Sequence, residues 1–169
     1  MPKVDVESDL PKLEKKVEAL VKEAGKINTE NKKRYAEFEN LNGALWEGKK
    51  IIEDNQKALK KEKDTKKVKA LADEIEEQEK TFKKISAKIP GIRKNVESTM
   101  KDAENCDKDL KSALDEIAAL NKALTRTAGF GDDLKEMAKQ LKDLEKKVDK
   151  AREIVGPIAT GGLPNTPKL

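Results

Sequence analysis

Apolar residues recur along the first third of the chain at alternating steps of three and four positions. The series begins at Leu10 and Leu13 and ends at Leu59, and polar residues fill its remaining positions without changing its phase. A heptad register held over this length is typical of one continuous helix in a coiled coil. The pattern therefore predicts a helix over 9–62, with Ser8 or Asp9 as its cap.

The stretch from Lys60 to Lys67 contains no apolar residue, and the heptad repeat loses its phase across it. We interpret it as the tip of a helical hairpin, with Asp64 or Thr65 capping the next helix. A second repeat then predicts a helix over 66–126. Pro90-Gly91 lies inside this repeat. Because proline removes a backbone hydrogen bond, we expect a kink at 90–91, and a full break stays open as the alternative.

Glycines at 129 and 131 predict a second turn over 125–132, and a third apolar repeat predicts a helix over 132–155. Gly156-Pro157 is expected to stop that helix, since glycine is common just past a helix end and proline after it. Residues 1–8 are interpreted as a polar leader. Residues 156–169 are interpreted as a Pro/Gly-rich flexible tail that stays mobile unless a partner holds it.

Two turns between three helices imply an antiparallel arrangement. Folding at the tip places Gly48 opposite Phe82 and Ala24 opposite Cys106. The third helix is too short to follow the whole hairpin. The sequence therefore predicts an all-α protein with one helical domain over 9–155. We expect an elongated antiparallel coiled-coil hairpin whose shorter third helix forms a three-helix bundle at one end.

Charged residues make up 41% of the chain and aromatic residues 3%, a balance that disordered chains share. The regular apolar spacing favours long helices instead. The formal net charge is +4. No segment approaches the roughly 18 apolar residues that span a bilayer, and the N-terminus lacks the apolar core of a secretory signal. We therefore expect a cytoplasmic protein, or one exported without a signal peptide.

The sequence offers little for catalysis. It contains no histidine, no cysteine pair and no glycine-rich phosphate loop between a strand and a helix. Its carboxylates alternate with lysines on faces that we expect to be solvated. Cys106 falls on the helix seam and is expected to be buried and inert. We therefore expect no enzyme, no cofactor, no metal and no small-molecule substrate.

Trp46 is the first candidate for protein binding. It follows the seam residue Leu45 and should point away from the second helix, where an exposed aromatic side chain can anchor a partner. Alternatively, it lies flat over lysine stems, or the twist of the hairpin buries it. The apolar stripe is broadened on the same helix by Ala44, Ile51 and Ala58. Together these residues indicate a protein partner or self-association.

Lysines at the tip are candidates for anion contact. Most simply they form a solvated turn, but they could touch phosphate or anionic lipid, a contact that salt would weaken. No aromatic residues interleave with them for base stacking. Nucleic acid or an anionic membrane is thus possible but not favoured. The candidates are Lys60, Lys61, Lys63, Lys66 and Lys67.

The tripeptide Trp46-Glu47-Gly48 resembles the W-x-G motif of the WXG100 family of small exported helical hairpins. The spacing of Tyr35 and Glu39 resembles that family's Tyr-x-x-x-Glu export signal. In the family the W-x-G motif lies in the turn between two helices, whereas here the heptads run straight through it. The outline is also similar to the stalk proteins of flagellar and type III export systems. These resemblances imply export, but they do not assign the chain to a family.

The sequence favours a non-enzymatic structural or adaptor protein that acts through its helix faces as a scaffold or spacer. One alternative is an exported effector or a secretion-apparatus component. Another is an amphipathic helical protein on anionic membrane or nucleic acid.

Overall fold

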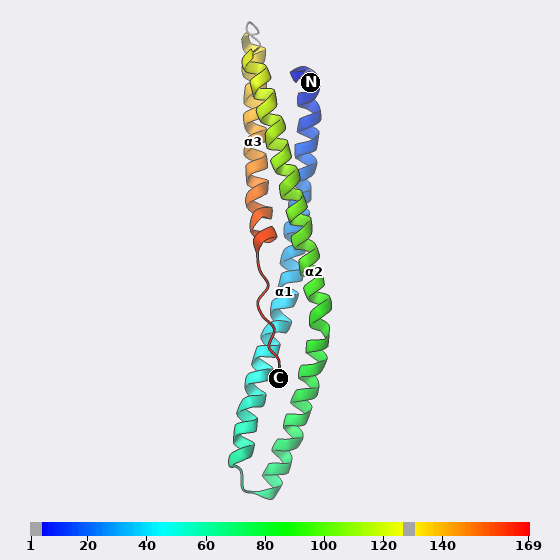
Figure 1. Cartoon of the computed structure of the whole chain (residues 1–169), viewed down its shortest axis with the longest axis vertical. Coiled ribbons are helices and arrows are strands. Elements are labelled where there is room, and N and C mark those ends of the chain that lie inside the picture. The colour runs from blue at the N-terminus through cyan, green and yellow to red at the C-terminus, as the bar shows by residue number, and fades with distance from the viewer. Residues whose placement is uncertain (1–4, 127–130) are drawn as a thin grey trace. The chain divides into compact units, whose positions relative to one another are not determined.

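The computed structural model describes residues 5–126 and 131–169, most of which form three helices (Figure 1). Helix α1 spans Val6–Lys61, α2 spans Thr65–Arg126 and α3 spans Gly131–Thr160. The all-α class is confirmed, as is the arrangement of a helical hairpin and a three-helix bundle. Long heptad repeats produce these helices because each repeat buries one stripe against a neighbour and leaves the charged faces in water.

The chain divides into two compact units where we predicted one domain. The bundle unit comprises residues 5–31 together with Ser98–Gly161. The hairpin unit comprises Lys32–Glu97 together with Gly162–Leu169. Both α1 and α2 are continuous helices that contribute to each unit.

The helix ends at the tip agree with the prediction, whereas the start of α1 and the end of α3 differ from it. At the tip, Asp64 caps α2, because its Oδ1 accepts from the Lys66 amide at 3.0 Å. Helix α1 begins at Val6, three residues before the predicted start, and the Asp5 amide donates to Asp9 Oδ2 at 3.1 Å. The local polar residues thus satisfy amides that lack partners at a helix start.

Gly156-Pro157 does not stop α3, which continues to Thr160 with Pro157 inside it. The prediction of a helix ending at 155 was therefore wrong. Ile158 and Ala159 pack against the core of the bundle, and this packing outweighs the hydrogen bond that proline removes. Helix α2 likewise continues through Pro90-Gly91, with the preceding Ile89 buried, so a full break is excluded.

The predicted turn over 125–132 lies partly outside the described residues, since Gly129 is not among them. The described part shows α2 reaching Arg126 and α3 starting at Gly131. Gly131 has a φ of 30°, in the left-handed region that glycine adopts without steric cost.

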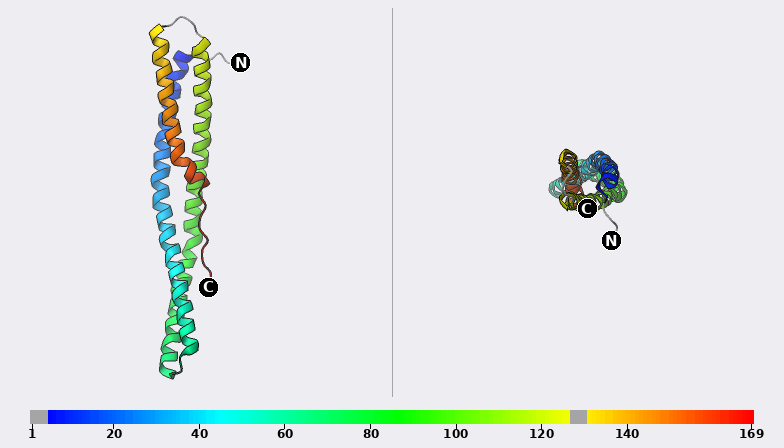
Figure 2. Two further views of the ribbon diagram at one scale, coloured as in Figure 1. Left: turned by 90° about the vertical axis from the view of Figure 1, so that its left-hand side faces the viewer. Right: turned by 90° about the horizontal axis from the view of Figure 1, so that it is seen from above.

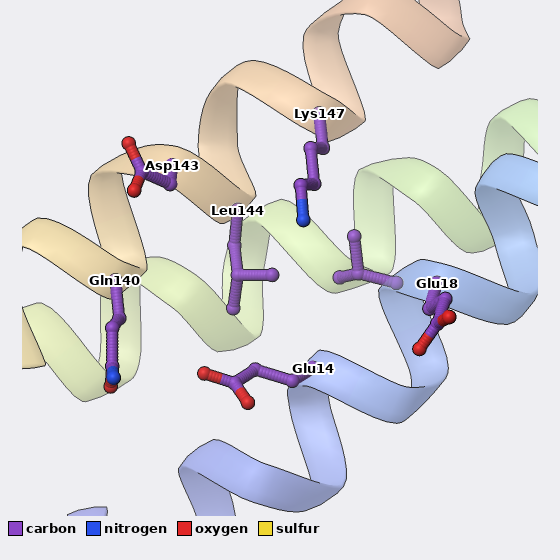
Figure 3. Close-up of a pocket in the computed structure, with 7 residues that line it drawn as sticks. Glu14, Glu18, Gln140, Asp143, Leu144 and Lys147 are labelled. Atoms are coloured by element: carbon purple, nitrogen blue, oxygen red, sulfur yellow. The ribbon is translucent and has the colours of Figure 1, made fainter.

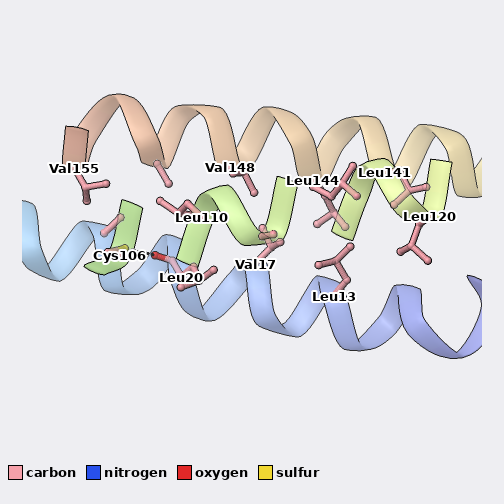
Figure 4. Close-up of a cluster of buried hydrophobic side chains, with 14 of the residues drawn as sticks. Leu13, Val17, Leu20, Cys106, Leu110, Leu120, Leu141, Leu144, Val148 and Val155 are labelled. Carbon is pink, nitrogen blue, oxygen red and sulfur yellow. Dashed lines mark hydrogen bonds between the residues drawn. The ribbon is translucent and has the colours of Figure 1, made fainter. Parts of the chain in front are cut away.

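Figure 2 shows the three helices of the bundle unit side by side. The unit holds one contiguous apolar core (Figure 4). Side chains from all three helices meet in it, and Val17, Leu110 and Val148 are each 0% exposed. This wide core is what we expected of a three-helix segment, where each helix covers the stripes of two others.

The hairpin unit has a narrower core. Within its two helices the buried apolar side chains recur every seven residues, while the seam positions between them are half-buried or polar. Gly48 lies opposite Phe82 as predicted, since a Cβ at Gly48 would stand 3.7 Å from Phe82 Cδ2. Between the same helices, Asn55 donates to Gln78 Oε1 at 3.0 Å. The buried set is Phe38, Leu45, Ile52, Ile75, Phe82, Ile89 and Val96.

Candidate binding site on the helical hairpin

The four residues predicted to bind protein do not share one surface. Successive helical residues are rotated by about 100°, so the residue after buried Leu45 and the residue before buried Ile52 lie on opposite sides of the seam. Trp46 is therefore on one flank of α1. Ala44, Ile51 and Ala58 recur every seven residues on the other flank, which we call the open flank.

On the side of Trp46, the tail of residues 162–169 lies against the hairpin. Figure 1 shows it running alongside the helices of this unit. The indole Nε1 of Trp46 donates to the Asn165 carbonyl at 3.3 Å, and Asn42 Nδ2 donates to the same oxygen at 3.4 Å. The tail is thus in contact with the hairpin, and the flexibility expected of residues 156–169 stays a prediction.

Arg93 holds the tail from the second helix. Its Nη2 donates to the Pro164 carbonyl at 3.2 Å and to Thr166 Oγ1 at 3.1 Å. Its guanidinium carbon also lies 5.2 Å from the ring centroid of Phe38, within the range of a cation–π interaction. Stacking on a buried aromatic ring restricts the arginine, so its donors are held in place for the tail.

The tail fits the hairpin closely at Pro167 and incompletely at Asn42. Pro167 is buried, although it is in the tail, whereas Leu169 two residues later is 57% exposed. Asn42 is 6% exposed, and its Oδ1 is buried without a hydrogen-bond partner among the described residues. A buried acceptor left unpaired is destabilising, so the fit is incomplete at this atom. We call the surface formed by Asn42, Trp46 and Arg93 the tail groove.

Trp46 is partly exposed and partly covered by a lysine, so two of the alternatives predicted for it apply together. Its side chain is 49% exposed, and the Lys49 ammonium lies 5.8 Å from the ring centroid. The lysine therefore covers part of the ring and the tail engages its N–H. Tyr35, the first residue of the export-signal resemblance, is half-buried with its ring 6.5 Å from that of Phe38.

The open flank has no such cover within the hairpin unit. Ile51 is 44% exposed, Ala58 is exposed and Ala44 is half-buried. An isolated exposed isoleucine would be unremarkable. Its place in a heptad stripe beside the seam is the arrangement that a further helix uses for packing.

At the tip, the five candidate lysines are all exposed. The two acidic residues among them are engaged locally, since Glu62 Oε1 accepts from the Asp64 amide at 3.2 Å and Asp64 caps α2. The tip is thus a solvated basic turn in this structure, and a role in anion contact stays a prediction.

Cys106 lies in the bundle core, 0% exposed, beside Leu20 (Figure 4). Its Sγ is 3.9 Å from the Leu20 carbonyl, to which the thiol donates. Burial, together with the nearby charges of Glu23, Asp109 and Asp107, raises the pKa of the thiol to about 11. A thiol held protonated is a poor nucleophile, so the expectation of a buried cysteine is confirmed and its chemistry is suppressed.

The bundle unit also carries an open groove of about 400 Å³ between α1 and α3. Its lining is largely charged or polar and consists of Glu14, Glu18, Gln140, Asp143 and Lys147 together with the apolar Val17 and Leu144. Figure 3 shows this lining in close-up. Among the described residues, no cluster of three or more acidic or cysteine side chains is placed to hold a metal ion. Across the same residues, no helix has an apolar stretch long enough to cross a membrane.

The fold and site define an all-helical protein with a bundle unit and a hairpin unit that holds an extended segment. Comparisons with protein-family models, curated proteins and solved structures found no match to this chain. The sequence did not point to Asn42 or Arg93 as site residues. The only available signal was the polar Asn42 placed three residues before buried Leu45.

Proposed function

We propose that this protein is a non-enzymatic adaptor or scaffold that binds a protein partner through the open flank of its hairpin. The single observation that carries the proposal is the second apolar stripe on α1, with Ile51 44% exposed between Ala44 and Ala58. A small–large–small stripe at heptad spacing accepts the apolar face of an amphipathic helix, which lays its side chains around the isoleucine.

The expected change in affinity follows from how much of the Ile51 side chain a partner would bury. Fully burying an exposed isoleucine side chain contributes about 1.5–3 kcal/mol, and because Ile51 is 44% exposed in the free chain, a partner that covers it gains roughly half of this. Each 1.4 kcal/mol corresponds to about a factor of ten in affinity. Replacing Ile51 with lysine removes this contribution and also places a charge in the contact.

The test compares Ile51→Lys with Val21→Lys in the full chain. Val21 is a matched control, since it is a β-branched residue on the same helix, 37% exposed, in the bundle unit. Partners captured from the source cells are purified and titrated against each variant, and self-association is measured by sedimentation velocity. We expect Ile51→Lys to weaken binding at least tenfold, with helix content and the Val21→Lys affinity unchanged. If Ile51→Lys binds as tightly as the wild type, the open flank is not the contact surface.

A further inference from the structure

The tail groove recognises its segment mainly through the backbone. Asn42 and Trp46, on α1, both donate to the carbonyl of Asn165, and Arg93, on α2, donates to the carbonyl of Pro164. Any peptide in an extended conformation offers carbonyls in this way. Side-chain selectivity comes from the Thr166 hydroxyl bound by Arg93 and the buried ring of Pro167, with Leu163 half-buried before them.

The segment is suited to binding by its composition. Pro164 and Pro167 restrict the backbone of the segment, so less conformational freedom is lost when it docks. Flat, donor-lined surfaces with aromatic side chains commonly bind proline-containing segments for this reason. The donors belong to the two helices of the hairpin, two on α1 and one on α2, and the tail is the segment that they bind.

The tail also leaves the groove incompletely satisfied. Its hydrogen bonds to the carbonyls measure 3.2–3.4 Å, at or beyond the long end of the usual N–H···O range. Asn42 Oδ1 is buried and has no donor in the described structure. The prolines at 164 and 167 carry no N–H that could reach it. A ligand with one more donor would therefore complete contacts that the tail leaves unmade.

A pair of glycines connects the tail to α3. Gly161 lies close to the last turn of the helix, where an added Cβ would stand 3.0 Å from the Pro157 carbonyl, and Gly162 has open space around it. At Gly161 the missing side chain avoids this close approach, so the chain can leave the helix there without a steric penalty.

We propose that the tail groove is a binding site for extended peptide segments of the form Pro-x-Thr-Pro. Residues 162–169 are its ligand within the chain, and a partner protein carrying such a segment displaces them. The site is distinct from the open flank, because it lies on the other side of the α1 seam. Its ligand can be tested as a synthetic peptide, so the outcome does not depend on the proposed function.

The test uses the full chain and its single tryptophan, Trp46, as the reporter. Pro167→Lys places a charge where a buried ring stands and is expected to detach the tail, which shifts the Trp46 emission to longer wavelength. Leu169→Lys makes the same charge change two residues away at an exposed position, and its emission should match the wild type. Circular dichroism checks that both variants keep their helix content.

An acetylated peptide with the sequence of residues 162–169, which contains no aromatic residue, is then titrated into each protein. We expect saturable binding to Pro167→Lys that returns the emission to the wild-type position. The wild type should need at least tenfold more peptide, since its own tail competes. Adding Arg93→Lys to the Pro167→Lys chain keeps the charge, removes the paired donors and should weaken peptide binding at least tenfold.

Three results would overturn the proposal. One is an unchanged emission in Pro167→Lys, and another is equal binding of a scrambled peptide. The third is a wild-type chain that dimerises in sedimentation while Pro167→Lys stays monomeric, which would identify a second copy's tail as the occupant in place of a partner's segment.

Discussion

Leu110→Ala tests whether the bundle core carries the stability that its packing implies. Leu110 is 0% exposed and lies among Val17, Leu20 and Val148 from the other two helices (Figure 4). The substitution removes the equivalent of about three buried methylenes, worth roughly 2.4 kcal/mol at about 0.8 kcal/mol each. Because three helices line the site, no single helix can move to fill the space, and a cavity term adds to the loss. We expect the free energy of unfolding to fall by about 3–4 kcal/mol, within the usual range of about 2–5 kcal/mol for such changes.

The assay is urea unfolding followed by far-ultraviolet circular dichroism, with Trp46 fluorescence recorded on the same samples. Coincident transitions by the two signals justify a two-state analysis. Ser112→Ala is the matched control, as Ser112 is exposed two positions along the same helix, and its free energy of unfolding should change by no more than about 0.5 kcal/mol. If Leu110→Ala is as stable as Ser112→Ala, the packing described for the bundle core is wrong.

Two further predictions concern single positions on the helices. Gly48→Ala should raise the free energy of unfolding by about 0.5–1 kcal/mol in urea unfolding, because the added Cβ meets Phe82 at an ordinary contact distance of 3.7 Å and alanine favours the helix; a loss of stability would mean that the helices cannot accept a methyl group there. Cys106 has a pKa raised from 9.0 to about 11 in the folded chain, so the unfolded thiol ionises first as pH rises. The stability that the protonated thiol contributes is fully present below pH 9 and is lost as pH rises from 9 to 11. In unfolding curves measured side by side with the wild type, Cys106→Ala should not show this loss of stability.

The helices and the hairpin could be predicted from the sequence because heptad phase is a long-range signal. A single shift of phase between Lys60 and Lys67 fixed the tip, and the pairing of Gly48 with Phe82 followed from it. Register of this kind survives local irregularities such as Pro90, since each turn of the helix is held by side chains packed across the seam.

Helix ends were less predictable, as Pro157 shows. Gly156-Pro157 is a stop signal on local grounds, but the local cost is one lost hydrogen bond. Ile158 and Ala159 gain contacts with the bundle core if the helix continues. Whether that gain exceeds the cost depends on how the third helix lies against the other two, which local sequence does not contain.

The tail groove could not be predicted for a different reason. Composition rich in glycine and proline is the usual sign of a mobile segment. The contacts that hold residues 162–169 are made largely to main-chain carbonyls, and every residue has a carbonyl. The donors Asn42 and Arg93 were visible in the sequence only as two polar residues on charged helices. Their convergence on one segment arises from the pairing of α1 with α2.

Trp46 and Ile51 have similar exposed fractions, 49% and 44%, yet they stand in different situations. The indole N–H of Trp46 already binds the Asn165 carbonyl, and Lys49 lies over its ring, so a partner arriving there must displace existing contacts. A partner arriving at Ile51 displaces only water from an apolar side chain, which is favourable in itself. Exposure alone would rank the tryptophan first as an anchor. The cost of displacing the tail reverses that order, and for this reason a partner on the open flank and a peptide in the tail groove are expected to respond to different substitutions.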